Sequence, residues 1–299
     1  MSLAPIALFV HARPSHTRRT VASLRANPAA RASDLIVFSD APKKPDQAEA
    51  VREVREFVRG IDGFASVKVV ERAQNLGLSG SITDGITRLC DQHGRVIALE
   101  DDLVVAPGFL EFLNTGLDRY ADAARVAQIS AYMFPTEAET RAAVFLPIIS
   151  CWGWATWKRA WDRYDPDMTG LRRLAENKDM RRRFDLGGAY PYYSMACQQQ
   201  RGKIDSWGIR WHLSVFMHDG LVLYPPRSLV QNEGVDSSGT HGAGHRELQT
   251  PLAQGVHANG RFSFPDRVEI SDDALGEVKR LLSSMQPGFL RRLVRWRPV

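Results

Sequence analysis

The sequence predicts an α/β protein with a mainly parallel sheet flanked by helices, and three observations support this fold class. Short apolar runs alternate with amphipathic segments through the first third of the chain. Two of the amphipathic segments stop at a glycine, Gly60 and Gly94. Polar or charged residues follow the apolar runs directly, as in "HARP", "SDAP" and "EDD". This alternation is typical of βαβ units, in which ligands bind beyond the carboxyl ends of the strands.

The expected elements of this first half follow one another in regular order. The apolar runs predict strands over residues 5–12, 34–40, 66–72 and 95–101. Helical spacing of apolar residues predicts helices over residues 14–25, 45–60 and 78–94. A sheet of parallel strands connected by helices follows from this order.

The second half is less regular. Its recognisable segments are a Trp-rich stretch, a basic helical stretch, a Trp-containing stretch, a strand-like run and a polar Gly-rich loop, at residues 151–161, 171–184, 203–216, 221–225 and 232–245. A predicted helix over 272–285 precedes a basic tail over 288–299. We expect one domain over residues 1–265, with halves at about 1–125 and 126–265, followed by a C-terminal helix and tail over 266–299.

Composition narrows the class of partner. The chain has 299 residues, of which 44% are hydrophobic and 24% charged, a profile typical of globular proteins. Its formal net charge is +5 and its pI is about 9.2, which suits an anionic small molecule or an anionic membrane surface. Because no basic stripe alternates with aromatic residues, we expect no nucleic-acid partner.

The sequence also predicts a cellular context. Cys90, Cys151 and Cys197 lie far apart, which favours no disulfide framework and a reducing compartment. The N-terminus has no basic region before its short apolar run, so we interpret this run as a strand and not as a signal peptide. The longest uncharged run, 142–157, is shorter than the ~20 residues of a spanning helix. We therefore expect a cytoplasmic protein. Its basic amphipathic tail suits peripheral contact with the membrane, although many soluble proteins also end in basic helices.

Three consecutive carboxylates, Glu100, Asp101 and Asp102, end the fourth predicted strand. Like charges at the end of a buried strand are costly unless a positive group neutralises them. Carboxylate oxygens suit Mg²⁺ or Mn²⁺, which often bridge to substrate phosphates. The alternative is a solvated acidic turn or a cap of the next helix. A P-loop enzyme would need GxxxxGK[ST], and the sequence has none.

The segment "VIALEDDLVVAPGFLEFL" resembles the acidic-triplet segment of the mannoside N-acetylglucosaminyltransferase family. Further similar segments run in the same order from about Pro5 to His241: "PIALFVHARPSHTRRTVASL", "SCWGWATWKRAWD", "DSWGIRW" and "PPRSLVQNEGVDSSGTHG". The layout, without a membrane anchor, is most similar to bacterial-type sugar transferases. The resemblance implies a GT-A-like, Rossmann-like fold and an inverting glycosyltransferase.

The resemblance also implies roles for the residues at the strand ends. Asp102 would be the direct metal ligand, for Mn²⁺ or Mg²⁺. Asp101 and Glu100 would contact the ribose or sugar of the donor, and Arg13 and Asp40 would hold the uracil and diphosphate. Asn75 and Ser81 are also expected to bind the nucleotide sugar. Independently of the resemblance, small residues at Asn75 and Gly77, in "ERAQNLGLSGSI", would let the N-terminus of the next helix approach the donor, although ordinary helix capping explains this segment equally well.

Asp205, before Trp207, would be the catalytic base. Here the sequence departs from the family, because "DSW" stands where Asp-Asp-Trp is expected. The alternatives for the base are Asp236 and Glu233.

Aromatic residues and one histidine complete the candidate site. The residues expected to contact the acceptor or the donor sugar are Trp152, Gly153, Trp154, Trp207 and His241. Apolar faces of sugars lie well on aromatic rings. Helical spacing of Trp154, Trp157 and Trp161 supports core packing as the alternative, and His241 could equally be an exposed loop residue.

Together these features predict a metal-dependent glycosyltransferase of the hexosyltransferase class. We expect a UDP-linked donor, with N-acetylglucosamine as the sugar that the resemblance implies, and a saccharide or lipid-linked acceptor in surface polysaccharide synthesis. One alternative is a sugar nucleotidyltransferase, which usually has a Gly-rich basic loop after its first strand, whereas "HARPSHTRR" has no glycine. The other is a non-catalytic saccharide-binding protein of the same fold.

Overall fold

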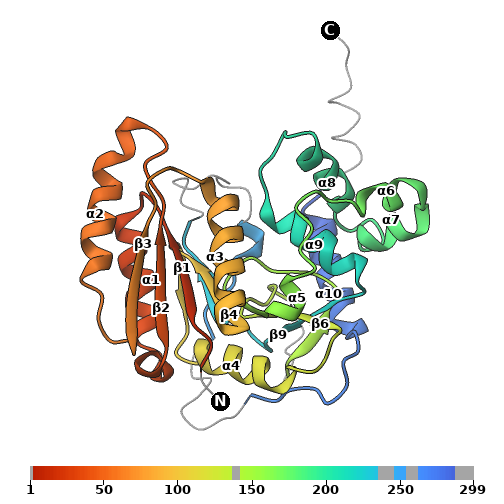
Figure 1. Ribbon diagram of the computed structural model, residues 1–299. Helices are drawn as coiled ribbons and strands as arrows, with labels where there is room; N and C mark the ends of the chain where they lie inside the picture. The colour runs from red at the N-terminus through yellow and green to blue at the C-terminus, as the bar shows by residue number, and fades with distance from the viewer. Residues whose placement is uncertain (1–2, 137–141, 235–245, 254–261, 287–299) are drawn as a thin grey trace.

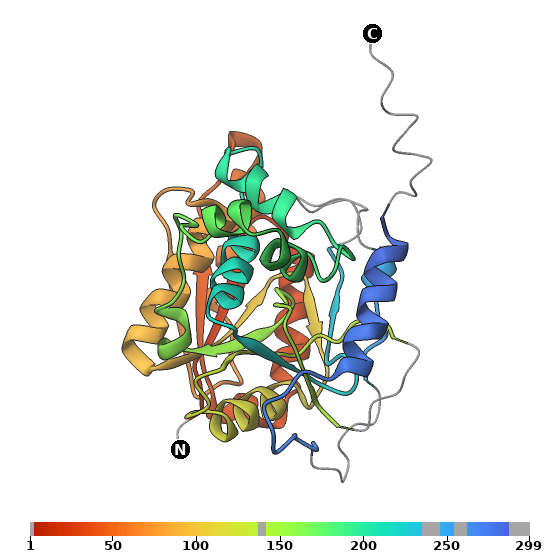
Figure 2. The same ribbon diagram turned by 90° about the vertical axis from the view of Figure 1, so that its right-hand side faces the viewer.

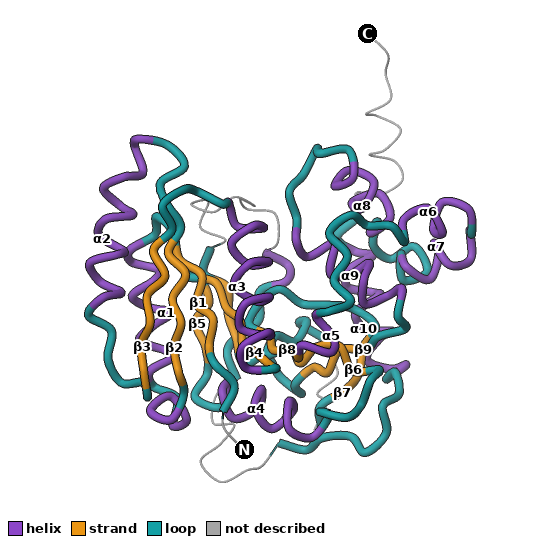
Figure 3. The backbone as a smooth tube through the Cα atoms, viewed as in Figure 1, coloured by secondary structure: helices purple, strands orange, loops and turns teal. Residues whose placement is uncertain are grey.

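The computed structural model describes residues 3–136, 142–234, 246–253 and 262–286. A single eight-stranded sheet runs through the molecule in the order β3-β2-β1-β4-β8-β6-β9-β7 (Figures 1 and 3). The strands in this order are Ser66–Glu71, Asp34–Ser39, Ile6–Val10, Arg95–Glu100, Trp154–Trp157, Val126–Ser130, Leu221–Tyr224 and Val144–Leu146. The predicted α/β fold class, with a mainly parallel sheet flanked by helices, is confirmed.

The first four strands are parallel and occupy the predicted segments. β1 pairs with β2 and β4, and β2 pairs with β3. Helices α1 (Pro14–Arg25) and α2 (Ala48–Arg59) cover one face of these strands, and α3 (Gly77–His93) covers the other (Figure 1). Right-handed crossovers require this division, because the chain moves outward from β1 to β3 and then returns to β4.

The second half adds strands in both directions. β8 pairs antiparallel with both β4 and β6, β6 pairs parallel with β9, and β7 pairs antiparallel with β9. A separate two-stranded ribbon joins β5 (Leu103–Val105) to β10 (Val230–Asn232). The ribbon brings the segment after β10 next to the acidic triplet at the end of β4.

The remaining helices cover the second half. They are α4 (Phe109–Arg119), α5 (Lys158–Trp161), α6 (Leu171–Glu176), α7 (Lys178–Phe184), α8 (Tyr192–Gln200), α9 (Trp207–Met217) and α10 (Asp272–Ser284), with short 3₁₀ turns at Pro28–Ala32, Pro45–Gln47 and Arg246–Leu248. Helices α6 to α9 gather around a small hydrophobic cluster of their own, while α10 lies on the opposite side (Figure 2).

Two segments with helical features in the sequence are arranged differently in the structure. Trp154 and Trp157 lie on strand β8, and only then does the chain turn into α5, so the helical spacing of the tryptophans was misleading. The basic stretch 171–184 is two helices, because the side chain of Asn177 accepts a hydrogen bond from the Met180 N–H at 2.9 Å and starts a new one. In the described residues, no helix is long and apolar enough to cross a membrane. The basic tail lies outside them.

Candidate active site

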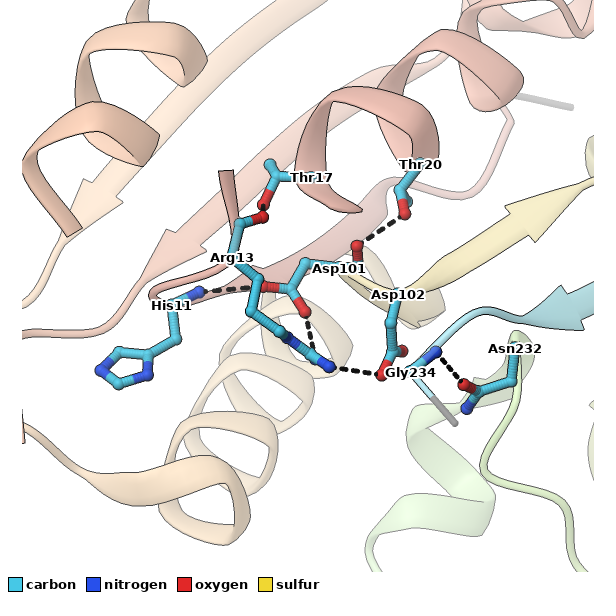
Figure 4. A network of polar contacts seen from close by, with 8 residues as sticks. All are labelled: His11, Arg13, Thr17, Thr20, Asp101, Asp102, Asn232 and Gly234. Carbon is cyan, nitrogen blue, oxygen red and sulfur yellow. Dashed lines mark hydrogen bonds and ion pairs between the residues drawn. The ribbon is translucent and has the colours of Figure 1, made fainter. Parts of the chain in front are cut away.

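The carboxyl ends of β1, β2 and β4 meet at one edge of the sheet. This places three predicted groups together: Arg13 after β1, Asp40 after β2, and the triplet after β4. The adjacency follows from the strand order, since β1 lies between β2 and β4. Figure 4 shows the polar contacts at this edge.

Arg13 lies between two carboxylates of the triplet and neutralises them. Its Nη1 donates to Asp102 Oδ2 at 2.9 Å, and its Nη2 donates to Asp101 Oδ1 (Figure 4). The side chains of Asp101 and Asp102 are only 4% and 11% exposed. Burial alone would lower the pKa of Arg13, but the two aspartates outweigh burial and raise that pKa above its ordinary value. The buried carboxylates are thus tolerated because a guanidinium pairs with both.

Backbone and hydroxyl groups hold this ion cluster in place. The His11 N–H donates to Asp101 Oδ2 at 3.2 Å, and Thr20 Oγ1 donates to the Asp101 carbonyl at 2.8 Å. Thr17 Oγ1 donates to the Arg13 carbonyl at 2.9 Å. Burial raises the pKa of Asp101 above its ordinary value even so. These hydrogen bonds and ion pairs therefore link the end of β1, the start of α1 and the end of β4.

The segment after β10 closes over Asp102. The Glu233 N–H donates to the Asp102 carbonyl at 2.8 Å. A Cβ on Gly234 would lie 2.2 Å from Asp102 Oδ2, so only glycine lets the backbone come this close. The Glu233 carboxylate, one alternative for the catalytic base, pairs with Arg19. Asp236, the other alternative, and His241 lie outside the described residues.

Glu100 lies at the end of β4, half-buried beside the cluster. Burial and, next, the charge of Asp102 raise its pKa from 4.5 to about 8, so the neutral acid dominates at pH 7. Cys151 lies close enough that the Glu100 charge, after burial, helps to raise the pKa of its thiol. The three members of the triplet therefore differ. Asp101 and Asp102 pair with Arg13, whereas Glu100 is mainly protonated at pH 7.

The pKa of Glu100 gives a pH-dependent stability that can be tested in metal-free buffer. Between about pH 4.5 and 8 the folded protein holds a proton that the unfolded chain releases, so this group's contribution to stability falls as pH rises. We expect Glu100→Gln to gain stability over the wild type through this window, by at most about 1.4 kcal/mol per pH unit. Thermal denaturation from pH 4 to 9 measures it. Glu111→Gln, on the exposed face of α4, is the control, and parallel profiles for Glu100→Gln and wild type would contradict the prediction.

Asp40 holds the loop before α3. Its carboxylate accepts hydrogen bonds from the N–H groups of Ala41 at 2.9 Å and Leu76 at 3.0 Å. Asn75 Nδ2 donates to the Ala41 carbonyl at 2.6 Å. Ser81 is buried in α3, and its Oγ has no hydrogen-bond partner among the described residues. Asp40 and Asn75 thus shape the edge of the site, and the donor contacts expected of them stay predictions.

The predicted sugar-contact residues divide by burial. The rings of Trp154 and Trp207 stack on each other with centroids 5.2 Å apart, and the two residues are 1% and 4% exposed. Core packing, the alternative left open by the sequence, describes both. Trp152 is half-buried, and its ring packs edge-on against Tyr132. Gly153 has a positive φ of 62°, and a Cβ there would lie 2.8 Å from the ring of Phe109.

Asp205, the predicted base, is exposed just before α9. Its side chain is 66% exposed, and Oδ1 lies 3.3 Å from Arg210 Nη1. Ser206 caps the helix, its Oγ accepting from the Ile209 N–H at 3.3 Å. A carboxylate held at a helix start in contact with water is available for proton transfer.

The surroundings of one buried carboxylate oxygen indicate whether a divalent cation could bind at this edge of the sheet. Asp102 Oδ1 is buried and has no hydrogen-bond partner among the described residues. A carboxylate oxygen is a suitable ligand for Mn²⁺ or Mg²⁺. In the described part of the chain, no three His, Cys, Asp or Glu side chains are grouped so that they could hold a metal. Asp102 Oδ1 could therefore serve as one protein ligand of such an ion.

Sequence reasoning missed three contributors to the site. They are the backbone of His11, Gly234, and Cys151 beside Glu100. His11 and Gly234 both lie next to predicted site residues in the sequence, so their positions could have been suspected. Nothing in the sequence indicates that Cys151 approaches Glu100.

Comparisons with known proteins give distant structural similarities. No protein-family model and no curated protein matches the chain. Staphylococcus aureus TarS 1–349 is 10% identical over 76% of this chain and 59% of its own, with a TM-score of 0.43. The chain spans only 21% of a longer TarS structure.

Two further solved structures are similar at the same level. The mannosyltransferase PcManGT from Pyrobaculum calidifontis, in complex with GDP-Man and Mn²⁺, is 12% identical over 72% of this chain and 69% of its own, with a TM-score of 0.40. A nucleotide-diphospho-sugar transferase, described as putative, from Desulfovibrio desulfuricans G20 is 16% identical over 55% of this chain and 68% of its own, with a TM-score of 0.34. Similarity at this level does not assign a function to the chain.

Proposed function

We propose that this chain is a metal-dependent, inverting glycosyltransferase that moves a sugar from a nucleotide-sugar donor to a saccharide or lipid-linked acceptor. One observation carries the proposal: a buried Asp102 oxygen, without a hydrogen-bond partner in the described part of the chain, lies beside the Arg13–Asp101 pair at the carboxyl ends of β1 and β4. Ligands of parallel α/β sheets bind at this edge. The resemblance of the acidic triplet to the mannoside N-acetylglucosaminyltransferase family names the reaction.

Two acidic residues, Asp102 and Asp205, would have separate roles in the reaction. Asp102 Oδ1 would hold Mn²⁺ or Mg²⁺, and the ion would neutralise charge on the diphosphate leaving group. Arg13 and the His11 N–H keep Asp101 oriented toward the donor. Asp205 would accept the proton of the attacking acceptor hydroxyl. The acceptor oxygen bonds to the anomeric carbon as the bond to the diphosphate breaks, so one displacement inverts the centre without a covalent intermediate.

The finer assignments rest on the family resemblance. They are a UDP-linked donor, N-acetylglucosamine as the sugar, and a place in surface polysaccharide synthesis at the cytoplasmic face of the membrane. Asn75, Ser81 and Trp152 would line the donor or sugar site around the ion cluster. Donor identity is set by a few side chains and is not specified by fold.

Nucleotide binding tests the proposal directly. We expect one of UDP, GDP, CDP and dTDP to raise the melting temperature by about 5 °C at a hundredfold excess over Kd, and only with Mn²⁺ present. Asp102→Asn should lose this shift, because it removes the carboxylate that would hold the ion. Differential scanning fluorimetry measures both.

The control is Asp62→Asn, an aspartate that pairs with Arg25 at the exposed end of α1, and it should keep the full shift. If no nucleotide stabilises the wild type, the donor site is wrong. An equal shift in Asp102→Asn would remove that residue from it.

A further inference from the structure

A second hollow lies beside the strand-end site, between α3 and α9. This pocket has a volume of about 520 Å³. Ser79, Thr83 and Asp84 line it from α3, Tyr164 from the loop after α5, and Asp205 and Arg210 from the start of α9. We call it the α3–α9 pocket.

The walls of the α3–α9 pocket are anchored to neighbouring elements. On the α3 side, the Leu76 N–H donates to Asp40, and Leu76 precedes the first turn of the helix that lines the pocket. On the α9 side, a Cβ on Gly208 would lie 2.8 Å from Cys151 Sγ, so α9 packs closely against the segment before Gly153. Arg210 Nη1 donates to Ser79 Oγ at 2.9 Å and so joins the two walls. The two walls are thus held together by side-chain contacts, the α3 wall begins at the loop that Asp40 holds, and Asp205 lies in the lining.

We propose that the α3–α9 pocket binds the acceptor saccharide, an inference that rests on the proposed glycosyl transfer. Polar side chains that could meet sugar hydroxyls surround it. Arg210 uses only Nη1 for its contacts with Ser79 and Asp205, and its other two nitrogens have no partner among the described residues. Tyr164 adds a ring held flat against Trp161, with centroids 4.5 Å apart and planes at 11°. A rigid ring beside hydrogen-bonding groups is suited to a sugar.

The charges in the pocket favour a neutral ligand. Asp84 pairs with Arg72 and lies 3.6 Å from Arg88. Arg210 is the pocket's cation, and it pairs with Asp205. Because each charge already has a counter-charge, the pocket offers no surplus cation for a phosphate group. It therefore suits a neutral saccharide and not the diphosphate end of the donor.

The position of Asp205 in the lining of this pocket supports its proposed role as the proton acceptor. Its exposed carboxylate lies in the lining, where a hydroxyl of a bound acceptor would reach it. The proton acceptor and the sugar that loses the proton would thus meet at the start of α9. Thr83 and Arg210 would then position the acceptor without touching the donor.

The test compares two tyrosine substitutions on one helix. Thr83→Tyr fills the pocket, whereas Gln92→Tyr adds the same bulk at an exposed position of α3. Saturation-transfer NMR measures binding of four probes: the methyl glycosides of mannose, galactose, glucose and N-acetylglucosamine. We expect at least one to bind the wild type and Gln92→Tyr, and to bind Thr83→Tyr at least about tenfold more weakly.

Arg210→Gln gives a second variant if Thr83→Tyr fails to fold, and it should weaken binding by about the same factor because it removes charged donors. Inorganic phosphate should not displace the glycoside. Binding of no probe, binding unchanged in Thr83→Tyr and Arg210→Gln, or displacement by phosphate would overturn the proposal. The nucleotide-dependent thermal shift of the wild type is read separately, so failure of the acceptor pocket is distinguishable from failure of the donor site.

Discussion

Replacement of Arg13 by alanine is expected to destabilise the metal-free protein by about 3–5 kcal/mol, because it leaves two buried carboxylates without a counter-charge. Asp101 and Asp102 both accept from this one guanidinium. Chemical denaturation in buffer with a chelator measures the free energy of unfolding. Arg13→Ala should lower the free energy of unfolding by less when it is made in Asp102→Asn than in the wild type, because one of the two buried charges is then already removed.

Arg18→Ala is the matched control for this prediction. Arg18 lies on α1, the helix that begins directly after Arg13, and pairs with Glu53 at 3.2 Å, but both side chains are about half exposed. An exposed pair contributes about 1 kcal/mol or less. A loss for Arg13→Ala as small as that for Arg18→Ala would show that solvent and not Arg13 compensates the triplet.

Gly153→Ala is expected to lower stability by about 2–5 kcal/mol, through two separate effects. Gly153 has a φ of 62°, a left-handed conformation that costs a residue with a Cβ about 1–2 kcal/mol. The new Cβ would also lie 2.8 Å from the buried ring of Phe109, and overpacking of a core typically costs about 1–3 kcal/mol. Urea denaturation of the two proteins measures the sum.

A second glycine separates the two effects. Gly202 has a φ of 66° with no atom near the position of a Cβ, so Gly202→Ala reports the backbone effect alone. If both variants lose the same stability, Phe109 moves aside without cost and the packing argument is wrong. Because Gly153 lies beside Trp152 and Trp154, a sugar-binding role for this segment must be tested in variants that first pass this stability control.

The first half of the fold could be predicted because its signals are local. Val51, Val54 and Val58 mark one face of α2, and Gly94 ends α3 with a φ of 75°, as the sequence indicated. The second half depends on contacts between distant residues. Strand β8 is only four residues long, and its tryptophans have a spacing that a helix would also produce. Short strands that are buried on both faces carry no periodic signal that distinguishes them from a helix.

The location of the candidate site could be predicted from the sequence, but most contacts between its side chains could not. Residues after strands β1, β2 and β4 had to meet at one sheet edge, and they do. The sequence could not show that Arg13 joins Asp101 to Asp102, because side-chain pairing depends on geometry and not on order. Nor could it show that the Asp40 carboxylate is occupied by two backbone N–H groups. Residue type indicates what a side chain can bind, while its neighbours determine what it does bind.

The position of β8 has a consequence for the synthesis of the chain. β8 completes the far edge of β4, yet it is made well after β4 leaves the ribosome. Until then β4 exposes a row of unpaired backbone groups along the apolar residues Val96 to Leu99, which is a template for pairing with other chains. A truncated chain that stops near residue 125 would keep this edge bare. The first half of the fold therefore depends on its later partner strand to cover this edge during translation, and nascent chains stalled before β8 are the form most exposed to aggregation.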